Sequence, residues 1–192
     1  MDFKTSQTMY NLARAFAGES QARTRYAVYA KVARKENYQN IAQVFEYTAH
    51  QELAHAEAFL NNLVGHYGQN LPNLNVNAGY PFEIGTTLEN LGFAKQAETD
   101  ENTSIYPNFA KIAQEEGFDD IARLFTLISK VEGRHANKYD SLFERMNKNT
   151  LYTSSFPTLW VCETCGYAVT AETPWTTCPV CGNNQGYIEM TN

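Results

Sequence analysis

Apolar side chains recur at helical spacing along most of this chain. Two of the clearest runs are marked by Leu12, Phe16, Tyr26, Tyr29 and Val32, and by Ile41, Val44, Phe45 and Thr48. This period places the apolar side chains on one face, which predicts amphipathic helices packed against one another. Polar breaks at 35–37 and 115–117 separate successive helices, because Asn37 and Gly117 tolerate the left-handed conformation that often ends a helix.

The helical pattern is an internal repeat. Residues 29–45 align without gaps on residues 109–125, at an offset of 80 positions. The repeat predicts that residues 1–146 form two related helix hairpins. The segment 65–87, rich in Gly, Asn and Pro, lies between them. A connection of this length fits the long crossover of a ferritin-like bundle, so the expected fold is an all-α four-helix bundle.

The pattern changes after the second hairpin. Residues 147–157 are polar and lack a helical period, which indicates a linker. Residues 158–192 contain both tryptophans and all four cysteines. A segment this short cannot be stabilised by apolar burial alone, so we expect a small domain held together by a metal ion.

Charge and composition exclude several classes of partner. The 192 residues include 15 basic and 21 acidic side chains, which give a net charge of −6. This balance argues against nucleic acid and against anionic membrane surfaces as main partners. No apolar run approaches the roughly 20 residues that span a bilayer, and the N-terminal residues do not resemble a signal peptide. We therefore expect a cytoplasmic protein.

Two Glu-x-x-His motifs carry the candidate chemistry: Glu52 with His55, and Glu132 with His135. They lie 80 positions apart, like the rest of the repeat. A three-residue spacing on a helix brings the two side chains to nearly the same face. Two such pairs on facing helices, with one more carboxylate from each remaining helix, form the ligand set of a carboxylate-bridged di-iron centre.

The additional carboxylates are Glu19 in the first half, and Glu98 and Glu101 in the second. Glu19 follows the small and apolar residues 15–18, where an unpaired charge would be costly. A single helical glutamate is ordinarily a solvated surface group, but that explanation does not account for a duplicated set. The candidate metal ligands are Glu19, Glu52, His55, Glu98, Glu101, Glu132 and His135. Six such groups suit two irons, so one ligand is spare.

The two halves differ near these carboxylates. Glu98 lies one position away from the repeat counterpart of Glu19, and a slip of one residue rotates a helical side chain by about 100°. Pro107 follows, and a proline inside a helix commonly kinks or bulges it. We therefore predict a π-type bulge near Tyr106–Pro107 that absorbs the extra residue.

Two tyrosines are candidates for contacts with the ligands. Tyr26 lies seven residues after Glu19 and hence on the same face, and Tyr106 lies near the predicted bulge. Either hydroxyl is placed to hydrogen-bond a ligand carboxylate. An ordinary position in the aromatic core explains each tyrosine equally well.

The four cysteines form two C-x-x-C pairs, Cys162 with Cys165 and Cys178 with Cys181, separated by 12 residues. Four thiolates at this spacing bind tetrahedral iron or zinc, and the absence of a signal peptide favours reduced thiolates over disulfides. A zinc ribbon that only stabilises the tail is one interpretation. The aromatic-rich surroundings and the attached redox-capable centre favour iron.

Over essentially its full length the chain resembles the rubrerythrin family. The resemblance rests on residues 16–23, Gln51-Glu52-x-x-His55, Glu98-x-x-Glu101, Tyr106-Pro-x-Phe-Ala, Glu132-x-x-His135 and the rubredoxin-like cysteine pairs. It implies that Glu52 and Glu132 bridge two irons, that Glu19 binds the first iron, and that Glu98 and His135 bind the second. It also implies that the first iron exchanges Glu101 in the oxidised state for His55 in the reduced state.

The resemblance further implies a peroxidase that reduces hydrogen peroxide to water at two non-haem irons. Electrons would enter through one iron in the rubredoxin-type site, where zinc can substitute, from a rubredoxin or NAD(P)H-dependent reductase chain. Family members are homodimers or larger, and the sequence leaves open whether helices are exchanged between subunits. We take Glu101, His55 and Tyr26 as candidate catalytic residues.

Two other functions compete with this one. The first is a ferroxidase or ferritin-like iron store, which the cysteine module disfavours because storage requires no rubredoxin-type centre. The second is a pure electron carrier, which the complete ligand set disfavours because a scaffold would not require it.

Overall fold

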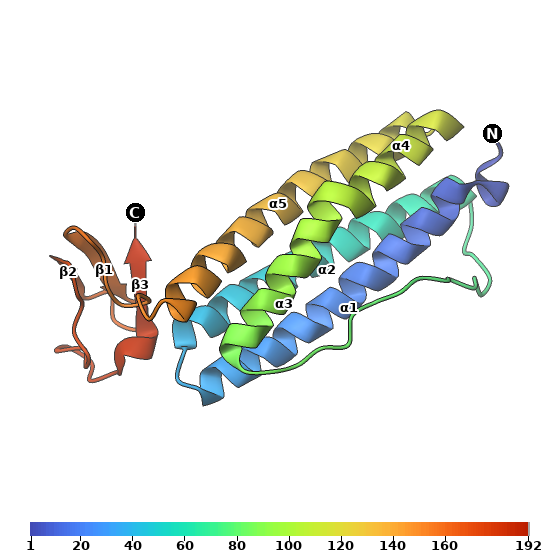
Figure 1. Cartoon of the computed structure of the whole chain (residues 1–192). Helices are drawn as coiled ribbons and strands as arrows, with labels where there is room; N and C mark the ends of the chain where they lie inside the picture. The colour runs from blue at the N-terminus through green and yellow to red at the C-terminus, as the bar shows by residue number, and fades with distance from the viewer. Residues whose placement is uncertain (192) are drawn as a thin grey trace.

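The computed structural model describes residues 1–191, so residue 192, the last of the expected C-terminal domain, lies outside the described part. Figure 1 shows an elongated helical bundle with a small β-sheet beyond one end. The main elements are α1 (Gln7–Lys35), α2 (Gln39–Tyr67), α3 (Thr87–Asp100), a π-helical segment η2 (Glu101–Ile105), α4 (Tyr106–Glu116), α5 (Asp119–Asn147), β1 (Thr158–Cys162), β2 (Ala168–Ala171) and β3 (Ile188–Thr191). Two short 3₁₀ helices, η1 (Phe3–Thr5) and η3 (Gln185–Tyr187), complete the set of elements.

Local capping chemistry sets the helix ends. The Ser6 side chain accepts a hydrogen bond from the backbone of Met9 at the start of α1, and Thr86 begins α3 with a capping box. Asn37, with φ 66°, lies in the predicted break between α1 and α2, and Gly117, with φ 87°, ends α4. The crossover begins later than expected. The helix continues through residue 65 to Tyr67, because the left-handed cap is Gly68.

The predicted bulge is present. The segments α3, η2 and α4 form one continuous helix, whose π-helical turn lies immediately before Tyr106. On α5, Ser129 Oγ donates a 2.9 Å hydrogen bond to the carbonyl of Asn102 within the bulge. Gly133 of α5 leaves room for the same residue, because a Cβ there would lie 3.0 Å from the Asn102 side chain. The neighbouring helix therefore accommodates the extra residue.

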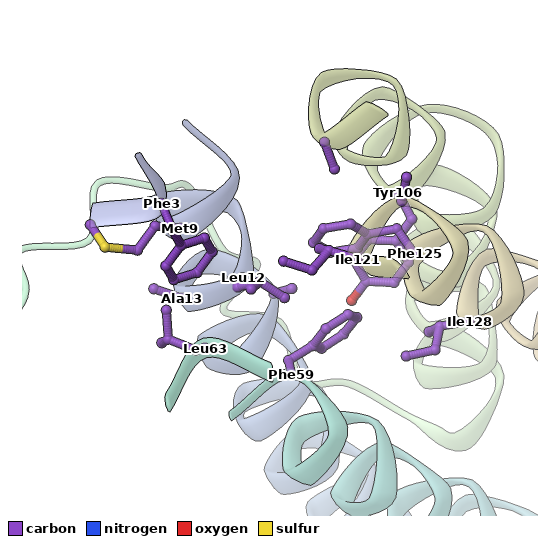
Figure 2. Close-up of a cluster of buried hydrophobic side chains, with 13 residues drawn as sticks. Phe3, Met9, Leu12, Ala13, Phe59, Leu63, Tyr106, Ile121, Phe125 and Ile128 are labelled. Atoms are coloured by element: carbon purple, nitrogen blue, oxygen red, sulfur yellow. The ribbon is translucent and has the colours of Figure 1, made fainter. Parts of the chain in front are cut away.

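Two apolar clusters fill the bundle. The cluster in Figure 2 lies toward the N-terminal end and contains Leu12, Phe59, Tyr106, Ile121 and Phe125 among its members. The second cluster, toward the sheet, includes Tyr26, Tyr29, Phe45, Leu91 and Tyr139. The members of both clusters come from helices of both hairpins, so the two halves share one core.

The crossover from 68 to 86 runs along α1 (Figure 1) and is attached to it by polar side chains. Arg14 Nε donates to the carbonyl of Asn77 at 3.0 Å, and Tyr80 Oη donates back to the carbonyl of Arg14 at 2.9 Å. Tyr29 Oη donates to the carbonyl of Glu83 at 2.8 Å. These bonds attach the crossover to α1 and give the carbonyls of Asn77 and Glu83 the hydrogen-bond donors that no secondary structure supplies.

The C-terminal module is a three-stranded antiparallel sheet in the order β2-β1-β3. Trp160 of β1 is buried and donates through Nε1 to the carbonyl of Ala171 at 2.9 Å. The module contacts the start of α2, where Asn40 Nδ2 donates to Glu163 Oε1 at 3.0 Å. At the end of α5, Arg145 binds the backbone carbonyls of Thr150 and Leu151 in the connecting segment.

None of the helices described here has the length and hydropathy required to cross a bilayer.

Candidate metal centres

A layer of buried acids crosses the middle of the bundle. Glu19 of α1, Glu52 of α2, Glu98 of α3 and Glu132 of α5 are each at most 1% exposed. Their oxygens and two imidazoles form two groups of donor atoms, with every atom of a group within 4.8 Å of the others. The groups are Glu19, Glu52, His55 and Glu132, and Glu52, Glu98, Glu132 and His135. Glu52 and Glu132 belong to both groups, as expected for carboxylates that bridge two ions.

Each histidine faces both shared carboxylates through Nδ1. His55 Nδ1 lies 2.9 Å from Glu52 Oε2 and 3.1 Å from Glu132 Oε1. His135 Nδ1 lies 2.9 Å from Glu132 Oε2 and 3.2 Å from Glu52 Oε1, and also 3.2 Å from Glu98 Oε2. The two rings are stacked, with centroids 6.0 Å apart. The two repeated Glu-x-x-His pairs are therefore related by an approximate two-fold axis that passes between the shared carboxylates of Glu52 and Glu132.

The two tyrosines bond across the hairpins. Tyr26 Oη of the first hairpin donates to Glu98 Oε1 of the second, and Tyr106 Oη of the second donates to Glu19 Oε1 of the first. The tyrosines are 80 positions apart, whereas the glutamates are 79 apart. The π-helical segment 101–105 lies between Glu98 and Tyr106 and accommodates this difference. Both interpretations left open for these tyrosines hold, because each ring lies in the core and each hydroxyl bonds a candidate ligand carboxylate.

Glu101 lies outside both groups of donor atoms. It is the first residue of the π-helical segment, is only partly buried, and lines a cavity of about 880 Å³ between α1, the crossover and α3–α4. The cavity is also lined by Arg25, whose Nε donates to Gln21 Oε1 at 2.9 Å. The structure therefore brings six of the seven predicted ligands together and places the seventh beside them, at a cavity wall.

Sequence reasoning missed two polar residues near the site. Arg25 shares the cavity with Glu101, and Gln51 Oε1 lies 3.0 Å from Nε2 of His135. The position of Arg25, six residues after Glu19, does not indicate that its side chain lines a cavity with Glu101. That cavity forms only because the crossover packs beside α1. The sequence presents Gln51 only as part of a motif, and its position directly before Glu52 is the one signal that indicates a place near the site.

The four cysteine sulfurs converge at the end of the sheet. Cys162 Sγ lies 3.7 Å from Cys181 Sγ, and Cys165 Sγ lies 3.6 Å from Cys178 Sγ. Sulfurs bound to one tetrahedral ion at about 2.3 Å lie about 3.8 Å apart, so the site fits such an ion. Each knuckle ends at a glycine with positive φ, 74° at Gly166 and 75° at Gly182, a conformation that other residues adopt with strain.

The sequence models of two domains match this chain. The model described as rubrerythrin matches residues 10–143, and the model described as the rubredoxin-like domain of rubrerythrin matches residues 160–189. Rubrerythrin of Porphyromonas gingivalis is 42% identical over 187 residues, covering 97% of this chain and 90% of that protein. Rubrerythrin-1 of Clostridium acetobutylicum is 38% identical over 187 residues, covering 97% and 95%.

The chain belongs to the rubrerythrin family. Rubrerythrins are oxidoreductases. A solved structure of nigerythrin in a partially reduced state superposes on this chain with a TM-score of 0.64 at 26% identity, covering 100% of this chain and 94% of that chain. A bacterioferritin from Desulfovibrio desulfuricans gives a TM-score of 0.66 at 21% identity, covering 75% and 82%. This second likeness shows the shared ferritin-like fold alone. The expected fold class is thus confirmed.

The donor atoms fit a rubrerythrin di-iron centre. Within residues 1–191, buried oxygens of Glu19, Glu52 and Glu132 lack a hydrogen-bond partner of good geometry, which is costly unless cations bind them. Two donor atoms that bind one ion at about 2.1 Å and at right angles lie about 3.0 Å from each other. The Nδ1 atoms of His55 and His135 lie 2.9 to 3.2 Å from oxygens of Glu52 and Glu132, which is close to that distance. The chain carries the glutamate and histidine ligands of this centre, and a four-cysteine rubredoxin-like site.

Without cations, proton binding compensates for the crowded charges. Burial, together with the Glu52 charge, raises the pKa of Glu98 to about 8, and burial raises the pKa of Glu19 well above its usual value. Burial lowers the pKa of His55, but hydrogen bonds to Glu132 and Glu52 outweigh it and raise that pKa to about 9. A buried set that holds protons in this way is set up to exchange them for metal ions.

Proposed function

We propose that this chain is a non-haem di-iron peroxidase that reduces hydrogen peroxide to water in oxidative stress defence in the cytoplasm. The observation that carries the proposal is the asymmetry of the ligand set: six donors converge, and Glu101 lies beside them at a cavity. Two iron ions supply the two electrons that cleavage of the O–O bond takes up. An additional carboxylate favours the harder ferric state, and an imidazole suits the ferrous state.

The residues around the centre have distinct roles in this proposal. Glu101 would be a ligand in the oxidised state, and His55 would take its place in the reduced state. In the metal-free protein, burial and then the charges of Glu98 and Glu132 raise the pKa of Glu101 well above its usual value. Reduction of peroxide to two waters consumes two protons and two electrons, and Glu101 lines the cavity beside the site. Tyr26 holds Glu98 in place through its hydrogen bond.

The four-cysteine site is the proposed entry point for electrons. An NAD(P)H-dependent reductase or a rubredoxin would reduce its iron, since iron cycles between two oxidation states and zinc does not. Figure 1 places the small sheet beyond one end of the bundle. The acid layer lies within α1, α2, α3 and α5. A second copy of the chain in a homodimer or larger assembly is therefore the proposed source of the cysteine site that reduces each di-iron centre.

The test compares two oxidants. Iron-loaded protein is reduced under anaerobic conditions and mixed in a stopped-flow instrument with hydrogen peroxide or with dioxygen, while the visible spectrum is recorded. A peroxidase is oxidised much faster by peroxide. Faster oxidation by dioxygen, or uptake of many irons per chain, would instead support the ferroxidase alternative.

A substitution at the spare ligand tests its role. Glu101→Ala is expected to retain iron at the six convergent donors, because Glu101 belongs to neither donor group. Oxidation by peroxide should slow by at least tenfold, because the ferric state loses its additional carboxylate. The matched control is Asp100→Ala, which removes the neighbouring carboxylate that lines the same cavity. Unchanged peroxide kinetics in Glu101→Ala would count against the proposed exchange.

A further inference from the structure

The two site histidines differ at the ring nitrogen that points away from the acids. His135 Nε2 lies 3.0 Å from Gln51 Oε1, and the Gln51 amide nitrogen donates in turn to Tyr47 Oη at 3.4 Å. Because the amide oxygen can only accept, His135 must carry a hydrogen on Nε2. Its Nδ1 faces Glu52, Glu98 and Glu132, so a metal ion that displaces the Nδ1 proton would meet this nitrogen in the orientation that a ligand requires.

The repeat replaces this polar pair with apolar side chains in the second half. At the offset of 80, Gln51 corresponds to Val131 and Tyr47 corresponds to Leu127. Among the described residues, the polar contacts of His55 all run through Nδ1, and its Nε2 has no hydrogen-bond partner. The two Glu-x-x-His pairs are repeated without change, so the difference between the two histidines lies in the residues that orient their rings.

We infer that Gln51 is a positioning residue that fixes His135 as a permanent ligand, and that Val131 at the equivalent position leaves His55 free to leave the metal. This inference rests on the proposed exchange of His55 with Glu101. It explains which of two symmetric histidines moves. Turning the His135 ring breaks a hydrogen bond in a mostly buried place, whereas turning the His55 ring breaks no hydrogen bond at Nε2.

The first arm of the test needs no catalysis. The full-length chain is loaded with Zn²⁺, which is diamagnetic, and the histidine ring nitrogens are followed by ¹⁵N NMR. In the unsubstituted protein the Nε2 hydrogen of His135 should exchange slowly with water. Gln51→Val should accelerate that exchange at least tenfold and weaken Zn²⁺ binding at the bundle site by about 10–100-fold, the usual effect of losing such a partner. Gln51→Glu retains an acceptor oxygen and should restore both properties.

The second arm transfers the polar partner to the other half. Val131→Gln supplies His55 with an acceptor in the place where Gln51 supplies one to His135. Zn²⁺ affinity should be retained, and crystal structures of the iron-loaded variant should show His55 bound in both oxidation states. Oxidation of the reduced variant by peroxide should slow at least tenfold. The melting temperature and the visible absorption of the four-cysteine iron report that each variant is folded.

The two arms separate the inference from the proposed function. Failure of the unsubstituted protein to react with peroxide overturns the proposed function, while the zinc experiment still tests the role of Gln51. Unchanged hydrogen exchange and zinc affinity in Gln51→Val overturn the inference. So does a Val131→Gln variant that exchanges His55 for Glu101 and reacts with peroxide at the unsubstituted rate.

Discussion

Two tyrosine hydroxyls connect the hairpins through the buried acids. Tyr26 donates to Glu98 and Tyr106 donates to Glu19, so each hairpin supplies the hydrogen bond for the other hairpin's carboxylate. A hydrogen bond to a buried carboxylate stabilises the bound geometry and satisfies an oxygen that water cannot reach. The tyrosines therefore link the stability of the bundle to the position of its terminal ligands.

Removing one of these hydroxyls should be costly. Tyr106→Phe leaves a buried Glu19 oxygen without its donor, and the free energy of unfolding of the zinc-loaded protein should fall by about 1–3 kcal/mol. Urea denaturation followed by circular dichroism measures the change. Tyr10→Phe is the control, because within residues 1–191 the Tyr10 hydroxyl makes no hydrogen bond. Equal stability of the two variants would show that the Tyr106 bond contributes nothing.

The protonation of the site residues gives a pH prediction for the metal-free protein. The pKa of Glu98 is raised to about 8 and that of His55 to about 9, and hydrogen bonds to Glu132 and Glu52 outweigh burial and raise the pKa of His135 to about 12. The folded state holds these protons more tightly than the unfolded chain, so their stabilisation is complete at low pH and is lost as pH rises through these values.

The metal-free protein should therefore become less stable between pH 5 and pH 9. Glu52 does not reverse this trend, because its pKa is about 2 and its contribution is lost only in acid, below about 4.5. Metal binding displaces the protons, so the zinc-loaded protein should become relatively more stable over the same interval. Thermal unfolding of chelated and loaded samples at several pH values tests this. A melting temperature of the chelated sample that rises with pH would contradict it.

At the scale of elements, one π-helical turn aligns the two hairpins. Without it, the third helix would carry Glu98 about 100° away from the direction that matches Glu19, because the glutamates are 79 positions apart and the tyrosines 80. The turn also begins at Glu101, the one candidate ligand with no counterpart in the first half. The insertion that breaks the repeat therefore supplies both the correct register and the additional carboxylate.

Deleting one residue from this turn should destroy the bundle site. Deletion of Thr103 converts the segment to a regular helix and rotates Glu98 relative to Tyr106, so the di-iron site should be lost while the four-cysteine site remains. Iron analysis and the visible spectrum distinguish the two. Deletion of Asn75, an exposed residue of the crossover, is the control and should leave both sites intact. Retention of bundle iron after the Thr103 deletion would refute the role of the turn.

At the scale of the whole molecule, the cysteine module docks against the turn between α1 and α2. Gly186 approaches that turn so closely that a Cβ would lie 1.8 Å from the carbonyl oxygen of Asn37. Asn40 and Glu163 add a 3.0 Å hydrogen bond across the same contact. Arg145, at the end of α5, holds the connecting segment by bonds to its carbonyls. These contacts set the direction in which the module leaves its own bundle.

Gly186→Ala should release the module. The added methyl cannot be accommodated against backbone, so hydrogen exchange of the amides around Asn37 should increase, while the visible absorption of the cysteine-bound iron stays unchanged. Gly79→Ala is the control, because a Cβ there meets open space. Unaltered exchange around Asn37 in Gly186→Ala would show that the contact does not hold the module.

The sequence by itself determined what depends on short-range spacing. The 80-residue repeat indicated the hairpins and the duplicated ligands, the one-residue mismatch between Glu19 and Glu98 predicted the bulge, and the cysteine spacing predicted a tetrahedral site. Helical periodicity and the reach of a C-x-x-C knuckle are local properties, so they are readable from residue order alone.

Only the tertiary structure decided which groups meet across the bundle. Tyr26 is an aromatic residue of the core, and only the packing of the helices brings its hydroxyl to Glu98. In the sequence, Glu101 belongs to the same ligand pattern as Glu98, but in the structure it lines a cavity formed partly by the crossover. Gln51 of α2 contacts His135 of α5, which is a different helix. Such contacts depend on how whole helices rotate and pack, a long-range outcome that local spacing does not encode.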